Sequence, residues 1–243
     1  MNYLLTLCYD GSRYSGWQIQ PDQITVQGEL EKALKQVFKT DIKTIASGRT
    51  DAGVSALGQT VSFFSDTLFK EYSLLGYLNT ILPDDIRVEK VQYVPDDFNA
   101  RFSSKKKTYA YNFYLSRLSK PYLDKFATRV GYKLDMDRLE KELLSLIGTY
   151  DFTTLSSVDT QVESKVRDIY DVRLEKHGEV YTVYFTGSGF LKNMIRIIMG
   201  TAFDIARGHI KESMLQLIDK KDRRCAGKTA GPVGLVLVEV NYI

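Results

Sequence analysis

The sequence predicts an α+β protein built from two ferredoxin-like halves, which join into one antiparallel-rich mixed sheet with helices packed on it. Two observations support this fold class. In the first hundred residues the apolar pattern alternates between periods of two and 3.6 in the order β-α-β-β-α-β, the order of a split βαβ unit. A similar succession of strand and helix patterns returns in the second part, without a sequence repeat.

The first half, residues 1–102, contains six expected elements. Its first strand ends at the turn signal Asp10-Gly11, and Thr25 is well placed to cap the first helix. In order, the expected elements are a strand at 3–9, an amphipathic helix at 26–38, short strands at 42–46 and 59–64, a helix at 72–81 and a strand at 86–94.

The second half, residues 103–243, begins after a junction near 98–106 and has a similar layout. It should contain a hairpin that turns at His177-Gly178 and a long helix rich in Met and Ile. The expected elements are a strand at 107–115, a helix at 136–147, hairpin strands at 166–175 and 180–186, a helix at 190–207 and a closing strand at 235–242.

Composition bounds the class of protein. The 243 residues are 44% apolar and 26% charged, enough for a core that needs no disulfide or metal. No apolar run approaches the roughly 20 residues of a membrane span, and the N-terminus lacks the features of a secretory leader. We therefore expect a cytoplasmic protein without a membrane segment, with Cys8 and Cys225 as reduced thiols.

Basic residues concentrate in the second half. The first 102 residues hold 10 Lys and Arg against 13 Asp and Glu, whereas the remainder holds 23 against 17. A fold that gathers the second-half cations would present a phosphate-binding surface, and the alternative is an ordinary solvated surface. The cations concerned are Lys105, Lys106, Lys107, Lys165, Arg167, Lys192, Arg196, Lys220, Lys221, Arg223, Arg224 and Lys228.

The inventory of catalytic groups is small. The chain has two His, no paired Cys/His spacing typical of zinc, and neither a GxxxxGK[ST] loop nor a GxGxxG fingerprint. Asp135-Met136-Asp137 opens a helix, where carboxylates stabilise the positive end of the dipole. We therefore expect no metal and no cofactor, and chemistry that rests on carboxylate, tyrosine, lysine and arginine side chains.

The loop SGRTDAGV, residues 47–54, is the densest candidate site. Residues two apart in an extended segment project to the same side, so Arg49 is placed to pair with Asp51 and keep its carboxylate ionised. An ionised, positioned carboxylate can act as a nucleophile. The alternative is a salt bridge that only stiffens the loop, and these residues alone leave both interpretations open.

A wider pattern accompanies this loop. The segments YDGSRYSGWQIQPDQITVQGELEKAL, ASGRTDAGVSALGQ and FNARFSSKKKTYAYNFY follow one another over 9–34, 46–59 and 98–114. Later segments agree with them, namely YDFT at 150–153, FLKNMIR at 190–196 and GLVL at 234–237. Together they closely resemble the TruA-type tRNA pseudouridine synthases, over essentially the whole chain.

The resemblance implies a role for four residues. Asp51 matches the catalytic aspartate, the nucleophile of the family, and Arg49 matches the arginine that accompanies it and helps displace the target base. Tyr109 matches the tyrosine that stacks on that base and takes part in proton transfer. Arg196 matches a basic residue that lines the cleft. Ser55 and Val236 depart from the family, which often has His and Tyr at these positions.

The resemblance also implies the reaction and its setting. Uridine is isomerised to pseudouridine at nucleotides 38–40, in the anticodon arm of tRNA, by a homodimer that uses no cofactor. One alternative is an RNA-binding module of the same fold without catalysis, for which a disrupted GRTD motif would be expected. Another is a glycoside hydrolase, which ordinarily needs a second carboxylate about 5–10 Å from the first; the sequence offers no convincing partner near Asp51.

Overall fold

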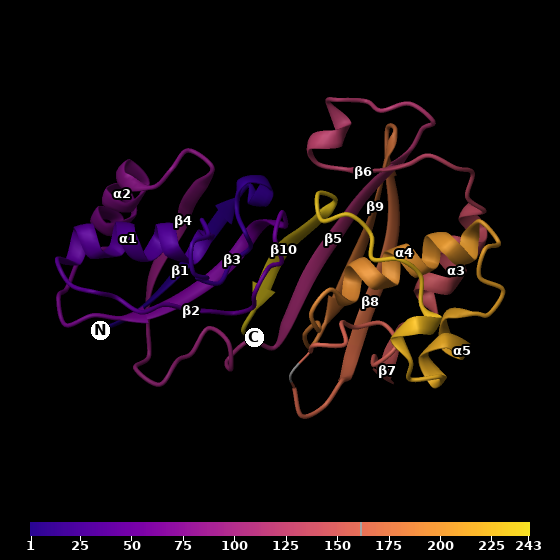
Figure 1. Ribbon diagram of the computed structural model, residues 1–243. Coiled ribbons are helices and arrows are strands. Elements are labelled where there is room, and N and C mark those ends of the chain that lie inside the picture. The colour runs from indigo at the N-terminus through magenta and orange to yellow at the C-terminus, as the bar shows by residue number, and fades with distance from the viewer. Residues whose placement is uncertain (161) are drawn as a thin grey trace. The chain divides into compact units, whose positions relative to one another are not determined.

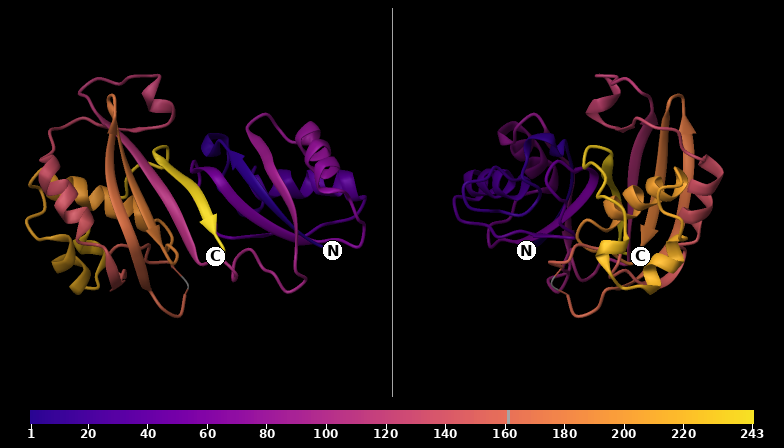
Figure 2. Two further views of the ribbon diagram at one scale, coloured as in Figure 1. Left: turned by 180° about the vertical axis from the view of Figure 1, so that it is seen from behind. Right: turned by 45° about the vertical axis from the view of Figure 1, so that its right-hand side comes forward.

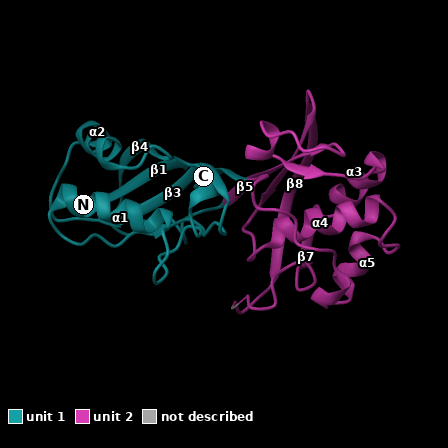
Figure 3. Cartoon of the chain, turned by 45° about the horizontal axis from the view of Figure 1, so that its top comes forward, with its two compact units in different colours: residues 1–105, 236–243 teal, residues 106–235 magenta. Residues whose placement is uncertain are grey.

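The computed structural model describes residues 1–160 and 162–243, which form two compact units (Figures 1 and 3). Unit 1 comprises Met1–Lys105 and Val236–Ile243, and unit 2 comprises Lys106–Leu235. The predicted halves, 1–102 and 103–243, differ from this division in the last strand. That strand, β10 (Leu235–Asn241), pairs in parallel with β3 (Ser55–Phe64), so the end of the chain returns to unit 1.

Unit 1 follows the predicted order β-α-β-β-α-β. Its elements are β1 (Asn2–Tyr9), α1 (Val26–Phe38), β2 (Ile45–Ala46), β3, α2 (Glu71–Ile81) and β4 (Ile86–Val94). Strand β1 lies between β3 and β4 and is antiparallel to both. Strands β2 and β10 share the other edge of β3: β10 pairs with its first residues and β2 with residues near its end.

Helix α1 has the bounds that the sequence predicts, and a capping residue marks each of its ends. The Thr25 hydroxyl accepts a hydrogen bond from the Gly28 N–H at 3.3 Å, and Lys39 ends the helix in the left-handed conformation, with φ +59°. The apolar stripe that includes Leu30 and Leu34 is fully buried. Helices α1 and α2 lie side by side on one face of the sheet (Figure 2).

Within unit 2 the strands follow the order β5-β9-β8-β7, with β6 parallel to β5. The predicted hairpin is confirmed and turns at Gly178, where φ is +61°. The elements are β5 (Lys106–Leu115), β6 (Thr128–Val130), α3 (Met136–Leu144), β7 (Gly148–Asp151), β8 (Val166–His177), β9 (Val180–Gly187), α4 (Met194–Ala206) and α5 (Met214–Asp219). The sequence analysis missed β6, β7 and α5, each six residues or shorter.

Helix α4 begins four residues later than predicted. Asn193 has φ +58°, a left-handed conformation that breaks helical continuity, and a turn in which the Met194 N–H donates to the Leu191 carbonyl at 3.0 Å precedes the helix. Almost every residue of α4 is buried, and it packs beside α3 in unit 2 (Figure 3). The two units thus confirm the α+β class, with helices packed on antiparallel-rich mixed sheets. None of the helices in the described part of the chain has both the length and the apolar character needed to cross a bilayer.

Candidate functional site

The loop SGRTDAGV, residues 47–54, connects β2 to β3 in unit 1. Its middle residues alternate in burial: Thr50 is buried, whereas Arg49 is exposed and Asp51 is half-buried. The side chains of Arg49 and Asp51 therefore project away from the core on either side of an inward-pointing Thr50, as expected for an extended segment. Within the described residues no ion pair joins Arg49 to Asp51, so the loop does not depend on that pair for its shape.

Thr50 attaches the centre of the loop to the core of unit 1. Its hydroxyl is hydrogen-bonded to the Tyr9 hydroxyl at 2.8 Å, and its carbonyl accepts a hydrogen bond from the Trp17 N–H at 3.0 Å. Burial raises the pKa of Tyr9 to about 12, so the phenol stays neutral at physiological pH and this buried hydrogen bond persists. The backbone on both sides of Thr50 is thereby fixed.

The beginning of the loop is held by β3. The Ser47 N–H donates to the Thr60 carbonyl at 2.8 Å, and the Ser47 hydroxyl donates to the side-chain carbonyl of Gln59 at 2.8 Å. The Gln59 amide donates in turn to the Gly48 carbonyl, also at 2.8 Å. Gln59 is fully buried, so these bonds are protected from water.

The end of the loop closes in a turn. The Val54 N–H donates to the Asp51 carbonyl at 3.1 Å, and Gly53, with φ +76°, donates its N–H to the Tyr14 carbonyl at 3.2 Å. Ser55, where the resembled family often has His, accepts a hydrogen bond from the Gly11 N–H at 3.0 Å. That departure therefore has a local role, which is to fasten the loop to the segment after β1.

Two glycines outside the loop allow the chain after β1 to lie directly against it. A Cβ atom on Gly11 would lie 2.1 Å from the Val54 carbonyl oxygen, and one on Gly16 would lie 2.7 Å from the Thr50 carbonyl oxygen. Gly16 also has φ +89°. Sequence analysis did not single out these two glycines, because their neighbours become visible only in the folded chain.

Tyr14 connects the loop to the half-buried carboxylate of Asp85. Its hydroxyl donates to Asp85 at 2.5 Å, and Arg13 lies 3.2 Å from the other carboxylate oxygen. Burial, together with the neighbouring Asp85 carboxylate, raises the pKa of Tyr14. The Tyr14 carbonyl accepts a hydrogen bond from Gly53, so Asp85 stabilises the loop indirectly by holding Tyr14 in place. Sequence analysis did not assign this role to Asp85.

Tyr109 lies on β5 in unit 2, opposite Phe185 of β9. Its side chain is only 7% exposed, and its ring meets that of Phe190 edge to face, with ring centres 5.3 Å apart and planes at 80°. Phe190 belongs to the turn before α4. The contact therefore fixes the orientation of the Tyr109 ring through the FLKNMIR segment at 190–196, where the sequence analysis also placed Arg196.

Arg196 lies in the first turn of α4 with its guanidinium held by two acceptors. Its Nε donates to the Ala230 carbonyl at 2.9 Å, and its Nη1 donates to the Asn193 side-chain carbonyl at 2.8 Å. The Asn193 amide donates to the Ser157 hydroxyl at 2.8 Å, which accounts for the strained backbone of Asn193. Burial raises the pKa of Tyr111 to about 12, and the nearby Arg196 charge opposes that rise.

The structure thus places Arg49 and Asp51 on one loop of unit 1, and Tyr109 and Arg196 on neighbouring segments of unit 2. The described residues contain no group of three or more His, Cys, Asp or Glu side chains arranged to hold a metal ion. What the arrangement offers chemically is a rigidly backed carboxylate, an exposed guanidinium, an oriented phenol and an oriented second guanidinium.

Comparison with known proteins defines the class. The family model described as tRNA pseudouridine synthase matches residues 7–103 and 143–243. A protein named tRNA pseudouridine synthase A from Caldicellulosiruptor saccharolyticus is 41% identical over 242 residues, which cover 99% of each chain. A protein of the same name from Bacillus licheniformis is 41% identical, and the match covers 100% of this chain and 99% of that one. Another from an Exiguobacterium strain is 40% identical, and the match covers 98% of this chain and 96% of that one. The chain therefore belongs to the tRNA pseudouridine synthase family, a family of isomerases.

Proposed function

We propose that this chain isomerises uridine to pseudouridine at nucleotides 38–40 in the anticodon arm of tRNA, with Asp51 as the nucleophile. The observation that supports the assignment most strongly is the GRTD segment itself. Both the side chain and the backbone of Thr50 are hydrogen-bonded to the core. The backbone from which the adjacent Asp51 side chain extends is therefore held in place. Proteins named tRNA pseudouridine synthase A match the chain along nearly its whole length.

The reaction conserves every atom of the nucleoside except one exchanged proton. The bond between N1 and C1′ breaks, the uracil turns, and C5 becomes bonded to C1′; the C5 hydrogen leaves as a proton and N1 takes up a proton. The Asp51 carboxylate has three possible roles: attack on C1′, addition to C6 of uracil, or promotion of proton loss at C2′. Each role needs an ionised carboxylate beside the flipped nucleoside, and the net reaction transfers no electrons.

Tyr109 and the two arginines complete the proposal. Flipping a base out of an RNA stack costs a few kcal/mol, and stacking on an aromatic ring recovers about 1–3 kcal/mol. The edge-to-face contact with Phe190 fixes the plane of the Tyr109 ring, which suits the ring to that stacking. Arg49 is exposed and so is suited to displace the base, and Arg196, whose guanidinium is oriented by hydrogen bonds, is suited to contact a phosphate of the RNA.

We infer further that the protein acts in the cytoplasm as a homodimer, with tRNA as its partner and without a metal or cofactor. The resemblance of the motifs supports the dimer, and the isomerisation chemistry supports the independence from a cofactor. Light scattering of the purified protein in the presence and absence of tRNA will give the mass of the species. A monomer under both conditions would contradict the homodimer.

The function is tested by tritium release. Unmodified tRNA transcripts carrying [5-³H]uridine should lose label to water when incubated with the intact chain, because C5 loses its hydrogen only when the new bond forms. Mapping of the product should place pseudouridine at positions 38–40. A transcript with cytidine at these positions serves as the control and should release no label. Absence of release from every unmodified tRNA by folded protein would overturn the proposed function.

Replacing Tyr109 separates stacking from proton transfer. Tyr109→Phe keeps the ring and its contact with Phe190, so we expect unchanged tRNA affinity and a turnover lowered by about 10². Tyr109→Leu removes the ring and should also weaken tRNA binding, by about 5- to 150-fold. Steady-state tritium release and fluorescence anisotropy measure the two effects. Tyr181→Phe and Tyr181→Leu, on an aromatic pair away from the proposed site, are matched controls, and equal behaviour of the two Leu variants would contradict the stacking role.

A further inference from the structure

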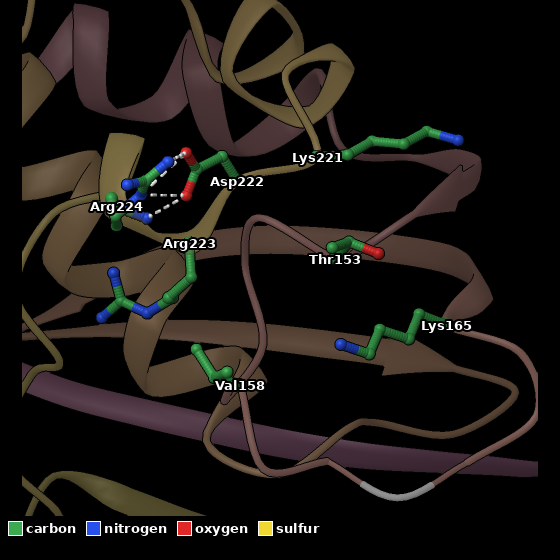
Figure 4. Close-up of a pocket in the computed structure, with 7 residues that line it drawn as sticks. All are labelled: Thr153, Val158, Lys165, Lys221, Asp222, Arg223 and Arg224. Carbon is green, nitrogen blue, oxygen red and sulfur yellow. Dashed lines mark hydrogen bonds and ion pairs between the residues drawn. The ribbon is translucent and has the colours of Figure 1, made fainter.

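Unit 2 contains a second basic feature, remote in sequence from the residues assigned above. A pocket of about 480 Å³ opens between the segment that leads into β8 and the turn that follows α5 (Figure 4). Its lining residues are Thr153, Val158, Lys165, Lys221, Asp222, Arg223 and Arg224. Four of the seven are cations and one is an anion, so the pocket carries an excess of positive charge.

Two of the four cations are already neutralised. Arg224 lies against Asp222, with both carboxylate oxygens hydrogen-bonded to its guanidinium at 2.7–3.0 Å. Lys221 forms an ion pair with Asp151 at 3.0 Å. These pairs leave Lys165 and Arg223, and among the described residues neither of them forms an ion pair with a carboxylate.

Arg223 is the more informative of the two. Arg223 is half-buried, and among the described residues its guanidinium donates to neutral oxygens alone, the Ala226 carbonyl at 3.4 Å and the Thr229 hydroxyl at 3.2 Å. Burial lowers the pKa of Arg223, whereas the partnered Asp222 raises that of the neighbouring Arg224. A partly desolvated guanidinium without an anion is costly, and an anion supplied from outside the chain would remove that cost.

The backbone around these cations is fixed before any ligand arrives. The Asp222 N–H donates to the buried Thr154 hydroxyl at 3.1 Å, and the Asp222 carboxylate accepts from the Arg224 N–H at 2.9 Å. On the opposite side, the Phe152 N–H donates to the Lys165 carbonyl at 3.0 Å. Figure 4 shows the Lys165 side chain extending into the space between the segment that leads into β8 and the turn that bears Arg223.

The chemistry of the pocket favours a phosphodiester. Two unneutralised cations exceed the single negative charge of one diester, and Arg and Lys are the usual partners of RNA phosphate oxygens. Val158, 80% exposed on the pocket wall, offers an apolar surface of the kind that a ribose can cover. We propose that this pocket binds a backbone phosphate of the tRNA substrate through Lys165 and Arg223, as an anchor separate from the Asp51 loop. The proposal rests on the proposed function, because it takes its ligand from there.

The test measures the affinity for tRNA as a function of salt. Fluorescein-labelled tRNA transcript is titrated with the Asp51→Asn protein, with and without Lys165→Gln and Arg223→Gln. Each lost phosphate contact lowers the slope of log K against log salt by about 0.7–0.9, so the pair of substitutions should lower it by about 1–2 and weaken binding about tenfold near physiological salt. Lys32→Gln with Lys35→Gln on α1 removes the same charge elsewhere and should change neither quantity.

Arg223→Lys controls for folding, because it keeps the charge and should retain the slope even if local packing changes. An unchanged slope and affinity in the Lys165→Gln, Arg223→Gln protein would overturn the proposal, as would a slope lowered equally by the α1 control. Saturation of the pocket by inorganic phosphate without any change in tRNA affinity would overturn it too. The proposed function is judged independently by tritium release from the protein with Asp51 intact, so failure of the phosphate anchor leaves the proposed function standing.

Discussion

Asp51→Asn is expected to release tritium from [5-³H]uridine-labelled tRNA at least about a thousandfold more slowly than the intact chain. The amide occupies the space of the carboxylate but lacks its charge and cannot serve as the nucleophile. The surrounding loop should keep its shape, because its bonds to Tyr9, Trp17 and Tyr14 all come from residues other than the Asp51 side chain. The affinity for tRNA should therefore change little, and single-turnover release under saturating protein isolates the chemical step.

Asp10→Asn is the matched control for Asp51→Asn. Asp10 lies at the end of β1, accepts a hydrogen bond from the Ser12 N–H at 2.9 Å and is exposed. Asparagine caps as well as aspartate, so this variant loses the same charge near the loop without losing a proposed catalytic group. A release rate for Asp51→Asn within tenfold of the Asp10→Asn rate would contradict the nucleophile assignment.

Gly16→Ala should lower the stability of unit 1 strongly, because an added methyl group there meets both a close contact and an unfavourable backbone conformation. The new Cβ would lie 2.7 Å from the Thr50 carbonyl oxygen, and the backbone φ of +89° is itself unfavourable for alanine. Strain and overcrowding together should lower the free energy of unfolding by about 2–4 kcal/mol. Because the atoms that must move belong to Thr50 and Asp51, we also expect turnover to fall about a hundredfold.

Gly178→Ala separates the two causes. Gly178 also has a positive φ, +61°, but no atom lies within 4 Å of its added Cβ. It should cost only about 1–2 kcal/mol for the backbone conformation and leave tritium release unchanged. Urea unfolding and tritium release on both variants make the comparison. Equal losses of stability and activity would mean that the contact with Thr50 has no special importance.

Local signals account for what the sequence predicted well. Helix 26–38 was right at both ends, because the Thr25 cap and the apolar spacing lie within the helix and its border. The helix predicted at 190–207 began too early because Phe190 and Leu191 look like helix residues. Their apolar side chains instead serve the turn before α4, where Phe190 contacts Tyr109, and Asn193 breaks the helix. Periodicity does not distinguish these two uses of an apolar side chain.

Longer-range contacts explain what sequence analysis missed. The strand at 235–242 was found almost to the residue, yet its return to β3 of unit 1 depends on a pairing between segments about 180 residues apart, for which local pattern holds no signal. The same is true of the supports behind the GRTD loop. Gly16 lies in the irregular segment before α1 and Asp85 in the turn before β4, and their closeness to Thr50 and Tyr14 is a property of the folded unit.

The position of β10 has a consequence for synthesis on the ribosome. Val236 and Leu237 pair with Ser55 and Ala56, the residues that directly follow the GRTD loop. Domains generally fold from the N-terminus as the chain emerges, yet unit 1 waits for its last strand until all of unit 2 has been translated. A nascent or truncated chain that ends before Val236 therefore leaves an edge of β3 uncovered beside the loop. The edge of β3 beside the GRTD loop is therefore covered only after the whole of unit 2 has been translated.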